Sequence, residues 1–118
     1  MSTVVSWNLQ MSVQDGQLDD ARALMEEMVA ATSEEQGTLA YEWFLSEDGT
    51  ACHIYERYAD SEAVMIHLGN FGSKFAERFL GCFKPASISV YGDPSVEARA
   101  ALDNFGAIYL GWFGGFNR

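Results

Sequence analysis

The chain has 118 residues, of which 48% are hydrophobic and 14% aromatic, and its formal net charge is −10. This length and composition predict one globular domain with its own core and argue against a disordered chain. Of the 17 acidic residues, 13 fall within residues 1–70, where only two basic residues accompany them. Such a surface repels phosphates, so the charge pattern argues against nucleic acid as a partner.

The two cysteines, Cys52 and Cys82, stand apart, without a CxxC pair or a Cys/His cluster at metal-ligand spacing. We therefore expect free thiols that pack as small apolar groups, and no metal site. The N-terminal segment lacks a basic region followed by an apolar run, which argues against a signal peptide. No apolar run is long enough to span a bilayer. The sequence thus predicts a cytoplasmic protein without a membrane partner.

The first half of the chain predicts a strand, a helix and a hairpin. Residues 3–13 alternate between apolar and polar side chains, which is the pattern of a strand. Residues 17–36 carry apolar side chains at helical spacing, and Gly37 is a stop signal. Two aromatic-rich runs, 38–45 and 51–59, flank the Asp-Gly pair of "SEDGT", which favours a hairpin.

The hairpin register determines which side chains share a face. A turn centred on the Asp-Gly pair places Tyr41 opposite Glu56, whereas a one-residue slip would reverse the sides of one strand. The first face then holds Leu39, Tyr41, Trp43, Leu45, Cys52, Ile54, Glu56 and Tyr58. The second face holds Ala40, Glu42, Phe44, His53, Tyr55 and Arg57.

The second half predicts a helix, a strand and an added segment. A capped helix begins after Asp60, and Gly69 and Gly72 predict a kink or break that divides it into two short helices. Pro85 introduces a fourth strand, and a short helix over 93–105 precedes a Gly-rich aromatic tail.

The resulting order, β-α-β-β-α-β with an α-β extension, predicts an α+β fold. It is the ferredoxin-like arrangement, an antiparallel four-stranded sheet with helices on one face. The core spans about residues 3–91 and the extension spans 92–118, within one domain. Because the strands carry apolar side chains on both faces, we expect two sheets to pair in a homodimer, a dimeric α/β barrel.

The sequence resembles the antibiotic biosynthesis monooxygenase (ABM) family of small dimeric α+β barrels. The resemblance covers roughly residues 3–91 and rests on "EEQGTLAYEWF" and on "YERYADSEAVMIHL", which contains Glu56, Tyr58 and His67. It implies an enzyme that oxidises a small hydroxyaromatic or quinol with O2 and uses neither a metal nor a flavin. A haem-degrading branch shares this barrel. This chain, however, lacks a His near Glu77–Phe79, where that branch places its iron ligand.

The resemblance and the chemistry of the side chains together predict a catalytic site. His67 would be a general base, Glu56 would orient it, and Asn8 would donate a hydrogen bond to a substrate oxygen. Four aromatic residues would hold a planar ring, namely Tyr41, Trp43, Tyr58 and Phe71.

Each of these assignments has a structural alternative. His67 and Glu56 can be buried polar groups that pair with other side chains, Asn8 can face solvent, and the aromatic residues can be ordinary core. The polar residues of the second hairpin face are expected at the dimer interface, namely Glu42, His53 and Arg57. The alternative function is a non-catalytic ligand-binding or structural dimer, for which we expect side chains to fill the space between helices and sheet and leave no ligand-sized cavity.

Overall fold

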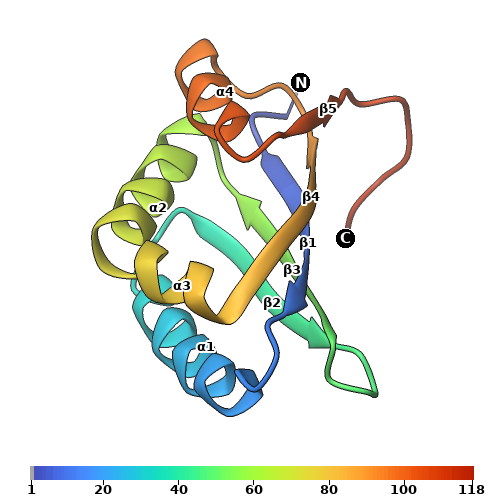
Figure 1. Cartoon of the computed structure of the whole chain (residues 1–118). Helices are drawn as coiled ribbons and strands as arrows, with labels where there is room; N and C mark the ends of the chain where they lie inside the picture. The colour runs from blue at the N-terminus through green and yellow to red at the C-terminus, as the bar shows by residue number, and fades with distance from the viewer. Residues whose placement is uncertain (1) are drawn as a thin grey trace.

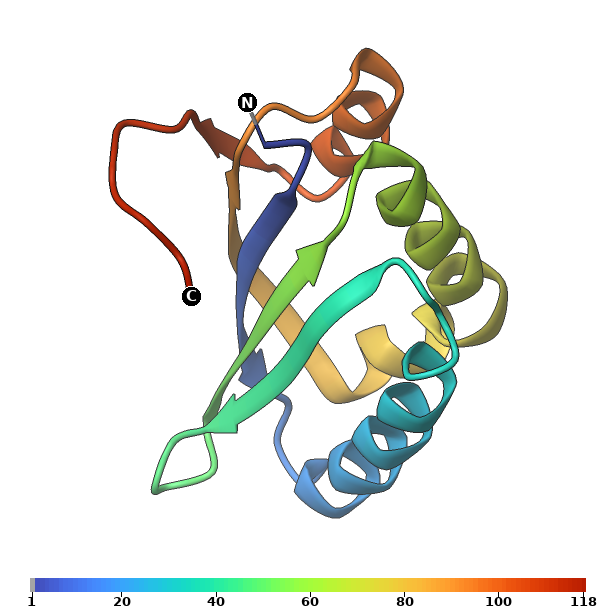
Figure 2. The same ribbon diagram turned by 180° about the vertical axis from the view of Figure 1, so that it is seen from behind.

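Four helices lie on one side of a five-stranded sheet in the computed structural model, which describes residues 2–118 (Figures 1 and 2). The strands are β1 (Val5–Val13), β2 (Thr38–Leu45), β3 (Ala51–Tyr58), β4 (Phe83–Tyr91) and β5 (Ile108–Leu110). The helices are α1 (Leu18–Thr32), α2 (Ser61–Lys74), α3 (Ala76–Cys82) and α4 (Val96–Asp103).

The strands are ordered β2-β3-β1-β4-β5 across the sheet. The first four pair antiparallel, and β5 adds to β4 in parallel, as a strand that follows a helical connection can do. This arrangement confirms the predicted α+β, ferredoxin-like fold and its α-β extension.

The hairpin between β2 and β3 has the predicted register, with Tyr41 opposite Glu56. The loop is longer than a two-residue turn, because the Ser46 amide donates to the Ala51 carbonyl at 2.9 Å. The Asp48 carboxylate stabilises this loop by accepting hydrogen bonds within it. The loop gains one residue on each side of the Asp-Gly pair, which leaves the pairing of the two strands unchanged. The side chains therefore keep their predicted faces, and Glu56 points toward the helices.

Helix α1 ends at Thr32, four residues before its predicted end, and residues 33–37 form a turn. Gly37 allows this turn to press against α2, since a Cβ at position 37 would lie 2.5 Å from the Cβ of Ala63. The Gly37 carbonyl also accepts from the Ala59 amide at 2.9 Å. The turn is therefore held beside the start of α2.

The predicted break at Gly69 and Gly72 is wrong in position. Helix α2 runs through both glycines, and the chain breaks at Phe75, whose φ of −128° separates α2 from α3. Each glycine costs about 1 kcal/mol of helix stability relative to alanine. The buried face that includes Val64 and His67 offsets this cost.

Strand β4 begins at Phe83, so Pro85 lies inside the strand rather than before it. Proline is tolerated there because β5 pairs only with Ser89–Tyr91 and leaves that part of β4 at an edge. The neighbouring strand shifts register opposite Pro85, between Gln10 and Met11.

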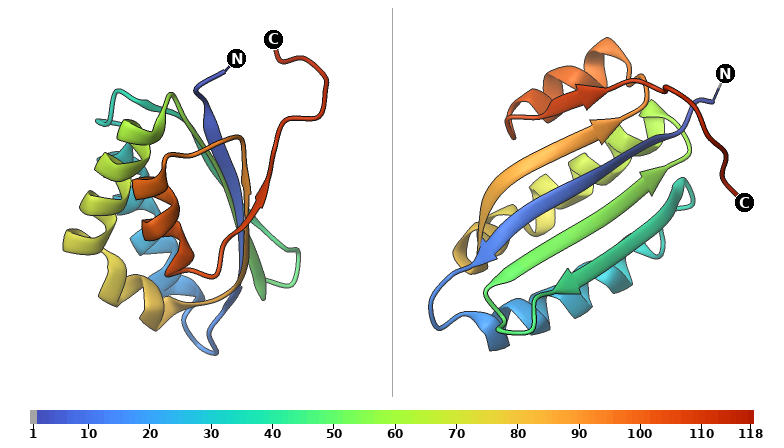
Figure 3. Two further views of the ribbon diagram at one scale, coloured as in Figure 1. Left: turned by 90° about the horizontal axis from the view of Figure 1, so that it is seen from above. Right: turned by 90° about the vertical axis from the view of Figure 1, so that its right-hand side faces the viewer.

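The core lies between the helices and the sheet, and Trp7 and Tyr58 are its largest fully buried side chains. Both cysteines are free and buried. The right panel of Figure 3 looks onto the opposite face of the sheet, which no helix of the described chain covers. The segment after β5 extends away on that side, and Phe113 is fully exposed.

Within residues 2–118, no helix combines the length and the apolar content needed to cross a membrane.

Candidate active site

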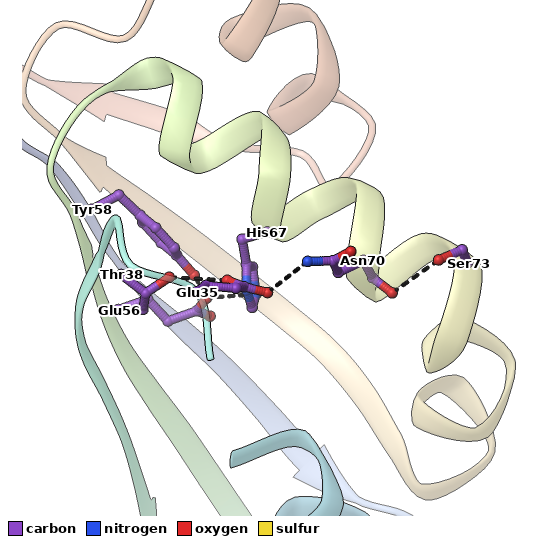
Figure 4. Close-up of polar contacts among 7 residues, drawn as sticks. All are labelled: Glu35, Thr38, Glu56, Tyr58, His67, Asn70 and Ser73. Atoms are coloured by element: carbon purple, nitrogen blue, oxygen red, sulfur yellow. Dashed lines mark hydrogen bonds and ion pairs between the residues drawn. The ribbon is translucent and has the colours of Figure 1, made fainter. Parts of the chain in front are cut away.

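His67 lies at the centre of a buried polar network between α2, β3 and the turn after α1 (Figure 4). Its ring Nδ1 is 2.9 Å from Oε1 of Glu35, and its Nε2 is 3.3 Å from Oε1 of Glu56. Helical spacing from Val64 places His67 on the buried face of α2, and the hairpin register places Glu56 beneath it. An imidazole is thus clamped between two carboxylates.

Tyr58 completes the network on the β3 side. Its hydroxyl donates to Oε1 of Glu56 at 2.5 Å, and its ring stacks against Trp7 with centroids 4.7 Å apart. Glu56 and Tyr58 alternate along β3 with the residues of the opposite face, which is why both point toward the helices. Glu56 is therefore held by a phenol and an imidazole together.

Glu35 holds the other side of His67. Its Oε1 also accepts from the Thr38 hydroxyl at 2.9 Å, and its Oε2 accepts from the Asn70 amide at 3.0 Å (Figure 4). The side chain of Glu35 is only 9% exposed. Three donors, one from β2 and two from α2, therefore fix both oxygens of this carboxylate.

The network sets the protonation state of His67. Burial by itself would lower the pKa of His67, but hydrogen bonding and the negative charges of Glu35 and Glu56 raise it to about 9. Burial works against the charge of Glu35, yet the donors around it lower its pKa. Burial and the charge of Glu56 raise the pKa of Tyr58. At neutral pH the centre is thus an imidazolium between anions, with a neutral phenol beside it.

A cavity of about 320 Å³ lies next to this network, between the helices and the sheet. Glu56 and His67 are its ionisable groups besides the hydroxyl of Tyr41, and most of its wall is apolar. The apolar part of the wall includes Trp7, Leu9, Met28, Ile54, Leu68, Phe71, Phe79, Leu80, Pro85 and Ile88. Its volume is in the range of small-ligand sites.

The predicted ring-binding residues divide into two groups. Tyr41 and Phe71 line the cavity. Tyr58 is fully buried behind it, and its ring centroid lies 5.2 Å from that of His67. Trp43 lines a separate cavity of about 150 Å³, and its indole N–H has no hydrogen-bond partner in the described chain. Trp43 therefore does not reach the site.

Asn8 is separated from the predicted site. Trp7 and Leu9 line the cavity, and side chains alternate along a strand, so Asn8 between them points to the uncovered face. In the sheet, Asn8 lies opposite Tyr55 on β3 and opposite Ser89 on β4. The sequence pattern placed Asn8 on the polar side of its strand, and that side lies opposite His67.

The structure adds contributors that the sequence did not single out. Glu35 fell in the last turn of the predicted helix over 17–36, although it belongs to the "EEQG" segment on which the family resemblance rests. The quoted motif thus contained Glu35, but a local pattern cannot show its contact with His67, which lies 32 residues further along the chain. The extension contributes one end of the cavity wall through Ala101, Leu102, Asn104 and Phe105.

Within residues 2–118, no set of three or more His, Cys, Asp or Glu side chains is arranged to hold a metal ion. Both ring nitrogens of His67 are already in contact with carboxylates. The side chains nearest the cavity are thus suited to proton transfer and to hydrogen bonding.

Together the fold and the network define a small α+β protein with an apolar chamber and an acid–base cluster in its wall. The sequence model of the family described as antibiotic biosynthesis monooxygenase matches residues 5–78. The chain belongs to this family, as the resemblance predicted.

Solved structures share the fold. MupZ from Pseudomonas fluorescens superimposes with a TM-score of 0.85 at 20% identity, over 100% of this chain and 91% of that chain. SnoaB from Streptomyces nogalater, described as a cofactor-independent oxygenase, gives 0.67 at 11% identity, over 80% and 97%. Rv0793 from Mycobacterium tuberculosis gives 0.61 at 22% identity, over 78% and 96%. No curated protein sequence matches the chain significantly.

Proposed function

We propose that this protein is a monooxygenase-like enzyme that oxidises a small, neutral hydroxyaromatic or quinol with O2. The observation that carries the proposal is the apolar cavity of about 320 Å³ with Glu56 and His67 in its wall. Membership of the ABM family supports it, as does the fold shared with the oxygenase SnoaB. By the same resemblance, the substrate itself supplies the electrons to O2, without a metal or flavin.

The substrate class follows from the charges around the cavity. None of its lining residues is a lysine or an arginine. The single cation is His67, which already faces the carboxylates of Glu35 and Glu56. An anionic ring would be repelled by this cluster, whereas a neutral ring with one hydroxyl would find apolar walls and a carboxylate acceptor.

The contacts change the role that we propose for His67. A base must have a free lone pair, and both ring nitrogens of His67 are engaged while its raised pKa keeps it protonated. Glu56 is the better base, because it borders the cavity and its carboxylate can accept the proton of a substrate hydroxyl. His67 then stabilises the negative charge that develops on the substrate oxygen or on reduced oxygen.

The electron balance is simple for a quinol. The quinol loses two protons and two electrons to become a quinone, and O2 accepts them to become H2O2. Where oxygen is inserted into a phenol, a ring C–H carbon becomes the second carbonyl of a quinone, and the second oxygen atom leaves as water with the C–H and O–H hydrogens. Tyr41 and Phe71 would hold the ring against Trp7 during this step.

Oxygen uptake with menadiol and a panel of related quinols tests the proposal. We expect uptake above the rate of autoxidation, and we expect addition of a metal chelator to leave it unchanged. Uptake at the autoxidation rate across the whole panel would contradict the proposal.

The second candidate function is a ligand-binding protein without turnover. The cavity favours it over a purely structural role, because a structural dimer needs no chamber of this size. Calorimetric binding of a stable quinone, combined with no oxygen uptake from the quinol, would favour this candidate.

We also propose that the protein is a homodimer whose sheets pack face to face. Large apolar side chains on the uncovered face and on the extension support it, since monomers seldom expose so many. They are Phe44, Ile108, Leu110, Trp112, Phe113 and Phe116. Sedimentation equilibrium tests this proposal: a dimeric mass is expected, and a monomer at micromolar concentration would contradict it.

A further inference from the structure

Glu35 is fixed more firmly than its position in a surface turn predicts. The turn places it beside α2, where it accepts hydrogen bonds from Thr38, His67 and Asn70. A second, small pocket lies on its outer side. A carboxylate with three directed donors can neither rotate nor move without breaking at least one of them.

This arrangement determines which hydrogen His67 presents to the site. An ionised carboxylate only accepts hydrogen bonds, so Nδ1 of His67 must carry a hydrogen at 2.9 Å from Glu35. The ring is then oriented with Nε2 toward Glu56, and both residues line the cavity. The contact at Nε2 is longer, 3.3 Å, and is the one that a substrate oxygen can share or replace.

We propose that Glu35 is a positioning residue that acts through His67: it holds Nδ1–H and keeps the ring an imidazolium whose Nε2–H faces the reacting oxygen. The chemistry assigned to the cavity rests on the proposed function above. The state of His67 does not, because it can be measured without any substrate.

Other charged or titratable groups lie around His67 on β2, on β3 and on α2 itself. Besides Glu35, these are Tyr41 on β2, Glu56 and Tyr58 on β3, and, on α2 itself, Lys74, which shares the small pocket with His67. The tyrosines remain neutral because their pKa values are raised by burial and by Glu56. Glu35 is therefore one of the two anions that hold the proton on His67.

The variant Glu35→Gln tests the inference because it keeps the shape of the side chain and removes its charge. The chain has two histidines, so ring ¹⁵N and ¹H spectra can be assigned with a His53→Gln variant. We expect the titration midpoint of His67 to fall by at least about one pH unit, as loss of a close opposite charge does. Glu34→Gln, a change of the exposed neighbouring carboxylate, should leave the midpoint unchanged.

The pH profile of quinol oxidation should follow the spectra. In Glu35→Gln the alkaline limb of kcat should move to lower pH by the same interval, with KM changed less than about threefold. If the wild type oxidises no quinol but the midpoint of His67 still falls, the role of Glu35 stands and only the proposed function fails. An unchanged midpoint in Glu35→Gln overturns the inference whatever the activity.

The wild type provides a second measurement should Glu35→Gln fail to fold. At pH 7 its ¹⁵N shifts should show two protonated ring nitrogens for His67, with the Nδ1 hydrogen in slow exchange with water. A neutral ring, or a ring that carries its hydrogen on Nε2 alone, overturns the inference.

Discussion

The two faces of β3 carry similar side chains in different surroundings. On the covered face, Glu56 meets His67, which is 5% exposed and lies between two carboxylates. On the uncovered face, His53 and Arg57 are half-buried, and neither makes a side-chain hydrogen bond within residues 2–118. The comparison teaches that residue type alone does not make a site. Burial together with fixed partners turns a carboxylate and an imidazole into an acid–base cluster.

Replacing one carboxylate on each face of the sheet, Glu56 on β3 and Glu42 on β2, should show the largest difference between the two faces. Glu56→Gln removes the proposed base but leaves an amide oxygen for the Tyr58 hydroxyl, so kcat/KM for a quinol should fall by about 10²-fold or more. Glu42→Gln, on the uncovered face, should keep wild-type turnover. Steady-state oxygen uptake makes the measurement, and full activity in Glu56→Gln would exclude it as the base.

The two histidines should differ in their contribution to stability. His67→Ala leaves Glu35 and Glu56 buried without their cation, and loss of one partner of a buried ion pair costs about 3–5 kcal/mol. His53→Ala should change the free energy of unfolding by about 0.5 kcal/mol or less. Urea denaturation of both variants measures the difference. Equal values would mean that the clamp around His67 adds no stability.

The pH dependence of the free energy of unfolding should report the titration of His67. Its pKa is raised from 6.5 to about 9 in the folded state, so the stabilisation is fully present below pH 6.5 and is lost as the pH rises through 9. The expected loss is roughly 3 kcal/mol. Urea denaturation between pH 6 and pH 10 measures it. A His67→Gln variant that declines over this range as steeply as the wild type would contradict the assignment.

Two glycines test how the turn holds Glu35 in place. A Cβ at Gly37 would meet Ala63, so Gly37→Ala should push the turn from α2, cost about 1–3 kcal/mol and lower the titration midpoint of His67. Gly69→Ala, in the interior of α2, meets nothing within 4 Å and should stabilise by up to about 1 kcal/mol. Thermal unfolding and the His67 spectra provide both readouts. A stable Gly37→Ala with an unshifted midpoint would show that the close approach is not needed.

The smallest effect is expected at the end of the cavity wall. Phe105→Ala should enlarge the cavity and raise KM for a small quinol by about tenfold, as loss of an apolar contact does, with a smaller change in kcat. Phe116→Ala, in the exposed tail, should leave KM unchanged in the assembled protein. Steady-state kinetics with quinols of increasing size would sharpen the comparison, since larger rings should gain in Phe105→Ala.

Much of the fold could be read from the sequence because it depends on local periodicity. The alternation in β1 and the Asp-Gly turn determined the faces of three strands, and with them the direction of Glu56. Helical spacing placed His67 on the buried side of α2. The break after α2 was misplaced because glycine propensity is weaker than the packing of a buried helix face.

The sequence by itself determined the fold class and the face of the sheet on which Glu56 lies, because period-2 and period-3.6 patterns act over a few residues. It indicated the family separately, through the resemblance of the segments that contain Glu35, Glu56 and His67. Only the tertiary structure decided that Glu35 reaches His67, that Asn8 and Trp43 do not line the chamber, and that the extension supplies one end of its wall. These outcomes depend on how a turn, a helix and a strand far apart in the chain pack together. The protonation of His67 follows from that packing, since it needs two carboxylates brought to one buried ring.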